Sequence, residues 1–157
     1  MMDLTNQMPI ATKSSKFDIS KESDTAKIAK EVSKKIKKGD ILFFFGEIGV
    51  GKTTFIKYMI NNLQKINKVK LTEVPSPTFN LLHEYKVKNI LIEHYDLFRI
   101  EKKIDIKNLG ILENCSSILT LVEWPEKISK RPKKRIELLF KYKSKSDKRI
   151  LKINEFR

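Results

Sequence analysis

The chain has 157 residues, of which 40% are hydrophobic and 33% are charged, and its formal net charge is +14. This length allows one domain with a single core and excludes two ordinary domains. Nine Phe, four Tyr and one Trp exclude a chain that is disordered throughout, and the longest apolar run, Ile41 to Phe45, is far shorter than the ~20 residues of a membrane-spanning helix. No secretion signal opens the sequence, and the single cysteine, Cys115, cannot form an internal disulfide. We therefore expect a cytoplasmic protein without a membrane segment.

The excess of 33 basic over 19 acidic residues raises the question of nucleic-acid binding. Only five of the basic residues are Arg, and the Lys are spread from Lys13 to Lys152. We interpret most of this charge as solvated surface. Two denser runs, Lys130 to Arg135 and Lys141 to Arg149, are the segments that could contact RNA or an acidic partner.

The first half of the chain predicts one arm, two helices and a strand. Residues 1–14 show no periodicity, and we expect them to form a weakly ordered arm before a domain at 15–157. Polar start signals after Ser20 and a four-residue apolar spacing predict a helix that Gly39 ends. The run Ile41 to Phe45 predicts a strand buried on both faces, and an amphipathic helix should follow from Lys52 to about Ile66.

The second half predicts mostly strands. Residues 78–85 and 90–97 read as a hairpin, residues 104–112 as a short helix, and residues 118–122 as another buried strand. Residues 135–142 and 149–154 alternate around a polar turn, which is typical of an antiparallel pair. Together these elements predict a single α/β domain with a mixed sheet flanked by helices.

The segment between the first apolar strand and the following helix matches the phosphate-binding pattern G-x-x-x-x-G-K-[ST]. Its residues are Gly46, Glu47, Ile48, Gly49, Val50, Gly51, Lys52, Thr53 and Thr54. The glycines allow a tight turn with inward-pointing N–H groups, and the helix N-terminus favours phosphate. We expect Lys52 to reach the β- and γ-phosphates of a nucleotide from an exposed loop, Thr53 to bind Mg²⁺ and Thr54 to donate to the α-phosphate.

Mg²⁺ at such a loop also needs a carboxylate from another strand end. Glu123 directly follows the apolar run 118–122, and Asp96 ends the stretch 90–95. We expect one of the two acids to ligate Mg²⁺, directly or through water, and the other to orient the attacking water or support the first.

Four motifs occur together in one order and spacing. They are the phosphate-binding loop, Ser76 to Phe79 (SPTF), His94 to Arg99 (HYDLFR) and Val122 to Glu126 (VEWPE). Over about residues 18 to 154 the chain resembles the TsaE (YjeE) family, the ATPase component of the machinery that makes N6-threonylcarbamoyladenosine in tRNA. It departs from the family pattern at Glu47, where Asp is usual, and at Phe98, where Tyr is usual.

The resemblance implies roles for individual residues. It implies ATP as the nucleotide, Mg²⁺ held by Thr53 and Glu123, and Asp96 acting in hydrolysis. It also implies that three residues outside the loop contact the nucleotide. Glu22 and Thr25 would lie near its base, and the third residue is Arg149. The expected catalytic residues are therefore Lys52, Asp96 and Glu123, and the implied partners are TsaD and TsaB, with any tRNA contact being indirect.

The residues around these motifs have less specific predictions. Residues 76–78 form either a switch-like loop beside the γ-phosphate or an ordinary strand entry. Trp124 is expected to pack as a platform beside Glu123, with core packing as its main role, and His83 and His94 are expected to be structural. Arg99 could pair with Asp96 or with a phosphate, and we favour the ion pair with Asp96.

We interpret the sequence as a small P-loop ATPase whose turnover powers or resets a partner complex. A kinase for a small molecule is the rival enzyme, and it predicts phosphate on an added metabolite. A basic RNA-binding adaptor that uses nucleotide only structurally is the second rival, and it predicts RNA affinity that survives loss of Lys52.

Overall fold

The computed structural model describes residues 13–102, 108, 110–113, 116–143 and 147–157. Within these ranges it contains seven strands, two α-helices and one short 3-10 helix. In chain order they are β1 (Lys13–Asp18), α1 (Glu22–Lys35), β2 (Ile41–Phe45), α2 (Lys52–Ile66), β3 (Leu82–Val87), β4 (Ile90–Asp96), β5 (Ile118–Glu123), η1 (Pro125–Lys127), β6 (Arg135–Tyr142) and β7 (Arg149–Phe156).

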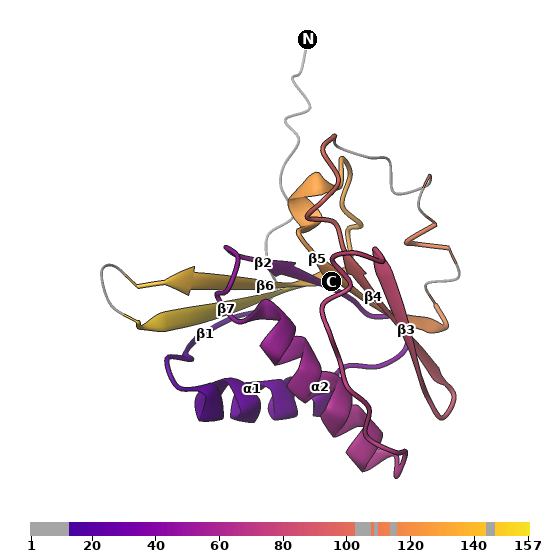
Figure 1. Cartoon of the computed structure of the whole chain (residues 1–157), viewed down its shortest axis with the longest axis horizontal. Coiled ribbons are helices and arrows are strands. Elements are labelled where there is room, and N and C mark those ends of the chain that lie inside the picture. Colours follow the sequence, from indigo (N-terminus) through magenta and orange to yellow (C-terminus); the bar gives the residue numbers. More distant parts are fainter. Residues whose placement is uncertain (1–12, 103–107, 109, 114–115, 144–146) are drawn as a thin grey trace.

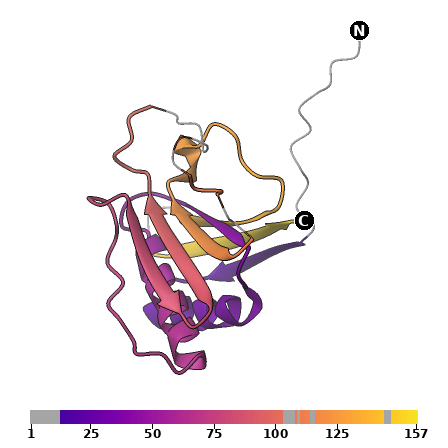
Figure 2. The same cartoon turned by 90° about the vertical axis from the view of Figure 1, so that its right-hand side faces the viewer.

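All seven strands of the described residues belong to one sheet, in the order β1-β7-β6-β2-β5-β4-β3. Strand β2 pairs in parallel with β5 and β6, and β4 pairs in parallel with β5. The outer pairs β1/β7, β7/β6 and β3/β4 are antiparallel. The predicted single α/β domain with a mixed sheet is confirmed. Both α-helices lie on the same face of the sheet (Figures 1 and 2).

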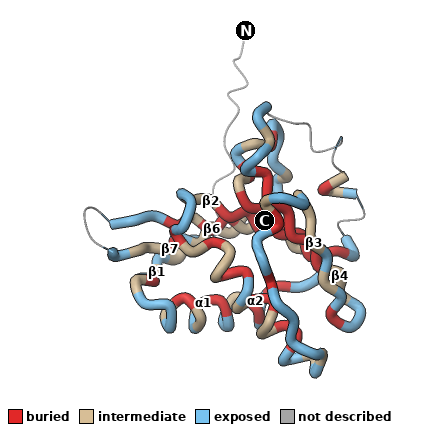
Figure 3. Tube along the Cα trace, in the orientation of Figure 1, coloured by how far each residue is buried: buried red, intermediate tan, exposed pale blue. Residues whose placement is uncertain are grey.

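The central strands of the sheet are buried (Figure 3), and their side chains pack into two core clusters, one on each face. On the helix side, the ring of Phe55 in α2 lies 6.1 Å from that of Phe44 and 5.7 Å from that of Phe140. On the other side, Phe43 and Val122 pack in a second cluster with residues of the segment after β4 and of the region around η1. Two-sided burial explains why β2 and β5 read as continuous apolar runs.

The N-terminal part departs from the prediction. Strand β1 begins at Lys13, inside the segment 1–14 that we expected to be an arm, while residues 1–12 lie outside the described part. This edge strand pairs only with β7 and is mostly exposed, so its sequence carries little hydrophobic signal. Helix α1 ends at Lys35, before the expected end at Gly39, and Gly39 instead adopts a φ of 96° in the turn that leads into β2.

The hairpin is confirmed, but its boundaries differ from the prediction. Strand β3 begins at Leu82 and not at residue 78, because the preceding residues turn: the N–H groups of Asn80 and Leu81 both donate to the carbonyl of Pro77, at 3.1 and 2.7 Å. The strand also runs on to the buried Val87, which shortens the connection to β4. A two-residue connection suits tightly paired antiparallel strands.

Other predictions are either confirmed or untested. Helix α2 occupies the predicted range Lys52–Ile66, and β6 and β7 form the predicted antiparallel pair. Most of the expected helix at 104–112 lies outside the described residues, as does Cys115. In the part of the chain that the structure describes, no helix is both long and apolar enough to cross a membrane.

Candidate active site

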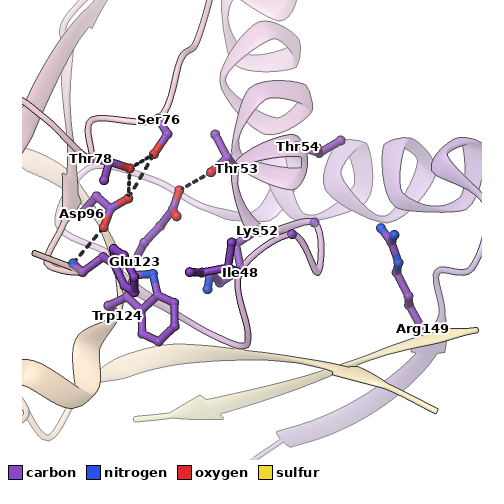
Figure 4. A pocket seen from close by; sticks show the side chains of 13 residues that line it. Ile48, Lys52, Thr53, Thr54, Ser76, Thr78, Asp96, Glu123, Trp124 and Arg149 are labelled. Carbon is purple, nitrogen blue, oxygen red and sulfur yellow. Dashed lines mark hydrogen bonds between the residues drawn. The ribbon is translucent and has the colours of Figure 1, made fainter. Parts of the chain in front are cut away.

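A pocket of about 370 Å³ opens at the edge of the sheet where β2, β4 and β5 end. Because these three strands run parallel, their carboxyl ends meet at the same edge, which is where open α/β sheets place their ligands. Figure 4 shows the side chains that surround this pocket. Its lining residues are Ile48, Gly49, Gly51, Lys52, Thr53, Thr54, Ser76, Thr78, Asp96, Phe98, Glu123, Trp124 and Arg149.

The loop between β2 and α2 has the backbone that its glycines predict. Gly46, Gly49 and Gly51 have φ values of 148°, 77° and 114°, a range that residues with a side chain rarely adopt. At Gly46 a Cβ atom would also lie 2.8 Å from the Val50 side chain and 2.9 Å from the carbonyl oxygen of Phe140. The loop therefore requires glycine at Gly46 for space as well as for conformation.

Lys52 is only 5% exposed, which corrects the expectation that it extends from an exposed loop. Its Nζ donates hydrogen bonds to the carbonyl of Gly46 and, at 3.3 Å, to that of Glu47. It also lies 4.0 Å from the centre of the Trp124 ring. Burial lowers the pKa of Lys52 from its ordinary value, and three nearby carboxylates oppose this shift: Glu123, Glu126 and Asp96.

Thr53 and Glu123 meet directly. The Thr53 hydroxyl donates to Oε1 of Glu123 at 2.8 Å, joining the first turn of α2 to the end of β5 (Figure 4). Strand register explains the meeting, because Glu123 lies beside Phe44 in the parallel β2–β5 pair, two residues before the loop begins. Strand β5, which ends at Glu123, therefore lies beside β2, the strand that leads into the loop.

Asp96 lies beside Glu123 in the register of β4 and β5, so both predicted acids reach the same pocket. Its Oδ2 accepts hydrogen bonds from the hydroxyls of Ser76 at 3.0 Å and Thr78 at 2.9 Å. Its Oδ1 accepts the main-chain N–H of Phe98 at 2.9 Å. The segment 76–78 is therefore a loop tied to Asp96 and not the entry of β3, and its place beside a γ-phosphate stays a prediction.

The sequence reasoning missed His94. This residue is fully buried, and its Nε2 lies 3.0 Å from Oε1 of Glu123. A signal was available, because successive side chains of a strand alternate between faces. His94 is two residues before Asp96 and so shares the face of the sheet that carries both acids. His83, by contrast, pairs with Asn80 at 3.0 Å and does not line the pocket.

The prediction for Trp124 is met in part, because its side chain packs against the second core cluster, and the ion pair predicted between Arg99 and Asp96 is wrong. Trp124 is only partly buried and lines the pocket, where its ring packs 4.9 Å from that of Phe98. Its backbone φ of 59° is unusual for a residue with a side chain. Arg99 does not pair with Asp96; its guanidinium stacks 4.1 Å from the centre of the exposed Phe79 ring.

The remaining predicted residues are dispersed. Thr54 and Arg149 line the side of the pocket away from the two acids (Figure 4), and Arg149 donates to the carbonyl of Val50 at 3.5 Å. Glu22 and Thr25 do not line the pocket: Glu22 accepts a hydrogen bond of 2.6 Å from Tyr58 of α2, and Thr25 is buried in α1.

Comparison with known proteins places the chain in a family. Residues 19–151 match the family model described as threonylcarbamoyl adenosine biosynthesis protein TsaE. Three similar relatives carry the name tRNA threonylcarbamoyladenosine biosynthesis protein TsaE. The relative from Rickettsia felis is 39% identical, and the match covers 69% of this chain and 61% of the relative. The relative from Rickettsia bellii is 37% identical, with 88% of this chain and 94% of the relative covered. The relative from Bacillus subtilis is 32% identical, with 81% of this chain and 77% of the relative covered.

The match to the Rickettsia felis relative and to that of Rickettsia conorii spans only 61% and 59% of their lengths. Among solved structures, the crystal structure of Bacillus subtilis YdiB is similar to this chain, with a TM-score of 0.72 and 26% identity over 92% of this chain and 87% of that one. The family match covers the loop, both acids and the full order of β2 to β6. This chain belongs to the TsaE family.

Proposed function

We propose that this chain binds and hydrolyses Mg-ATP in the cytoplasm, and that this turnover supports a complex of TsaD- and TsaB-type proteins that forms N6-threonylcarbamoyladenosine in tRNA. The main support for the proposal is the hydrogen bond of 2.8 Å between Thr53 and Glu123, which joins the first turn of α2 to the end of β5 beside the expected phosphate-binding loop. The pathway is supported by family membership and by the names of the relatives.

The residues at the pocket fit a magnesium ion. A hydroxyl and a carboxylate, from Thr53 and Glu123, are the hard oxygen donors that Mg²⁺ prefers. Among the described residues no group of three or more His, Cys, Asp or Glu could hold a metal, so the phosphates and water would complete the coordination. Bound there, Mg²⁺ would neutralise charge on the β- and γ-phosphate oxygens.

The chain's own residues supply positioning and charge. The Nζ of Lys52 now contacts two loop carbonyls, and in this proposal it exchanges one of them for phosphate oxygens. Asp96 is the candidate for orienting the attacking water, because its carboxylate lies at the pocket beside Glu123. Its hydrogen bonds to Ser76 and Thr78 couple that role to the position of the 76–78 loop.

Phosphate release from ATP, measured with the purified chain alone and then with TsaB and TsaD, tests the proposal. We expect Mg²⁺-dependent release that the partners increase. Loss of the gene should lower threonylcarbamoyladenosine in tRNA, and only a hydrolysis-competent copy should restore it. Phosphate found on an added metabolite would favour the kinase, and rescue by a copy that cannot hydrolyse ATP would contradict the proposal.

A further inference from the structure

Glu123 is held from two sides by donors that both reach the same oxygen. Its Oε1 accepts the Thr53 hydroxyl at 2.8 Å and faces Nε2 of His94 at 3.0 Å. A carboxylate oxygen has two lone pairs, so these two donors occupy Oε1. None of the described residues donates a hydrogen bond to Oε2 of Glu123, which leaves that oxygen for a ligand in the pocket.

The surroundings of His94 make the contact with Glu123 its defining interaction. His94 has no exposed surface, and its other ring nitrogen, Nδ1, is buried without a hydrogen-bond partner. Because a carboxylate can only accept, Nε2 must carry the proton. A histidine retained only to fill the core would leave two polar nitrogens in an apolar setting at a cost that Leu would avoid.

We propose that His94 is a positioning residue for the metal site. Its Nε2–H fixes Oε1 of Glu123 against Thr53 and so directs Oε2 to the pocket, where it holds Mg²⁺ or a water bound to the ion. This inference rests on the proposed function, because it assigns a purpose to Glu123 in the same site. It differs from the role of Asp96, whose two oxygens are both engaged by the 76–78 loop and by Phe98.

The test compares His94→Leu, which removes the donor, with His94→Gln, whose amide N–H reaches the position of Nε2. Binding of a non-hydrolysable ATP analogue is measured by calorimetry across a Mg²⁺ titration and again in EDTA. Outer ligands of metal sites typically contribute 10–100-fold in affinity, so His94→Leu should raise the half-saturating Mg²⁺ concentration by about tenfold or more. Binding in EDTA should not change, and His94→Gln should restore most of the Mg²⁺ dependence.

His83→Leu is the matched control, because His83 is the cross-strand partner of His94 in β3 and makes no contact with Glu123. It should titrate like the wild type. A folded His94→Leu protein with the wild-type half-saturating concentration would overturn the inference. If the His94→Leu protein does not fold, His94→Asn takes its place, because the shorter Asn amide does not reach the position of Nε2. Equal Mg²⁺ titrations of the His94→Asn and His94→Gln variants would then overturn the inference. A wild-type chain that binds no Mg-ATP would instead refute the proposed function.

Discussion

Lys52 holds a positive charge in a nearly closed setting, where two main-chain carbonyls and an indole ring surround its ammonium group. Desolvation of that charge is partly offset by the carboxylates at the pocket. A ligand with negatively charged oxygens in the pocket would offset the desolvation of the Lys52 charge further. Lys52 thus helps to hold the loop in shape through the carbonyls of Gly46 and Glu47, and in the proposed function it also contacts phosphate.

Lys52→Ala should therefore abolish Mg-ATP binding or hydrolysis while the fold is retained. Because the carbonyls of Gly46 and Glu47 lose a donor but can turn to water, the cost in stability should be on the order of 1 kcal/mol. That cost corresponds to a decrease of about 2–4 °C in Tm for a chain of this size. Calorimetry with ATP measures the loss of binding, and a thermal melt measures the change in Tm. Unchanged ATP affinity and turnover would refute the assignment of residues 46–54 as a phosphate-binding loop.

The two acids should give different phenotypes. Glu123→Gln should weaken the Mg²⁺ dependence of nucleotide binding, because Glu123 contacts Thr53. Asp96→Asn should leave binding closer to normal and lower turnover, because its partners belong to the 76–78 loop. Mg²⁺ titrations of binding and single-turnover rates of both variants measure the difference. Reversed phenotypes would exchange the two roles.

At the scale of elements, the strand–loop–helix unit from β2 to α2 is constrained most strongly at its first glycine. Gly46→Ala would bring a Cβ atom within 2.8–3.0 Å of Val50 and Phe140. We expect a loss of about 1–3 kcal/mol in the free energy of unfolding.

Gly49→Ala is the control for this prediction. It also has a positive φ, but the nearest atom to its Cβ would be the Tyr142 hydroxyl at 3.8 Å. Urea denaturation should show the larger loss for Gly46→Ala. An equal loss in both variants would mean that backbone conformation, and not contact with Phe140, decides the cost.

Elements with strong hydrophobic periodicity could be predicted from the sequence, and those stabilised by tertiary pairing could not. The α2 range and the buried strands β2 and β5 follow from apolar pattern alone. Strand β1 has one inward-facing aromatic residue, Phe17, and depends on β7 for its hydrogen bonds. Strand β1 forms because it pairs with β7, and such pairing between distant segments cannot be predicted from the local sequence pattern.

The candidate site shows the same division. The convergence of Asp96 and Glu123 could be predicted because both end strands that run in the same direction. Strand alternation also indicates that His94 shares a face with Asp96, but its contact with Glu123 depends on the register of β4 against β5, which the sequence does not specify. Likewise, only the fold of the 76–78 loop places the Ser76 and Thr78 hydroxyls on a carboxylate 18 to 20 residues away.

For the molecule as a whole, the +14 charge offers a competing explanation for any effect on tRNA modification. Nonspecific phosphate contacts weaken steeply with salt and need no ATP. We expect association with purified TsaB and TsaD in the absence of tRNA, dependent on Mg-ATP and retained at moderate salt. Pull-downs across a salt series, with and without Mg-ATP, measure this. Association that needs tRNA and disappears at moderate salt would favour the RNA-binding adaptor.

The place of Trp124 has an optical consequence. It is the only tryptophan of the chain, and its indole lies at the pocket with the Lys52 ammonium 4.0 Å from the ring centre and Phe98 beside it. Intrinsic fluorescence excited at the indole band therefore originates from one place in the whole protein. A ligand that draws Lys52 away from the ring changes the field at that single chromophore, so occupancy of the pocket can be followed in the unlabelled native chain.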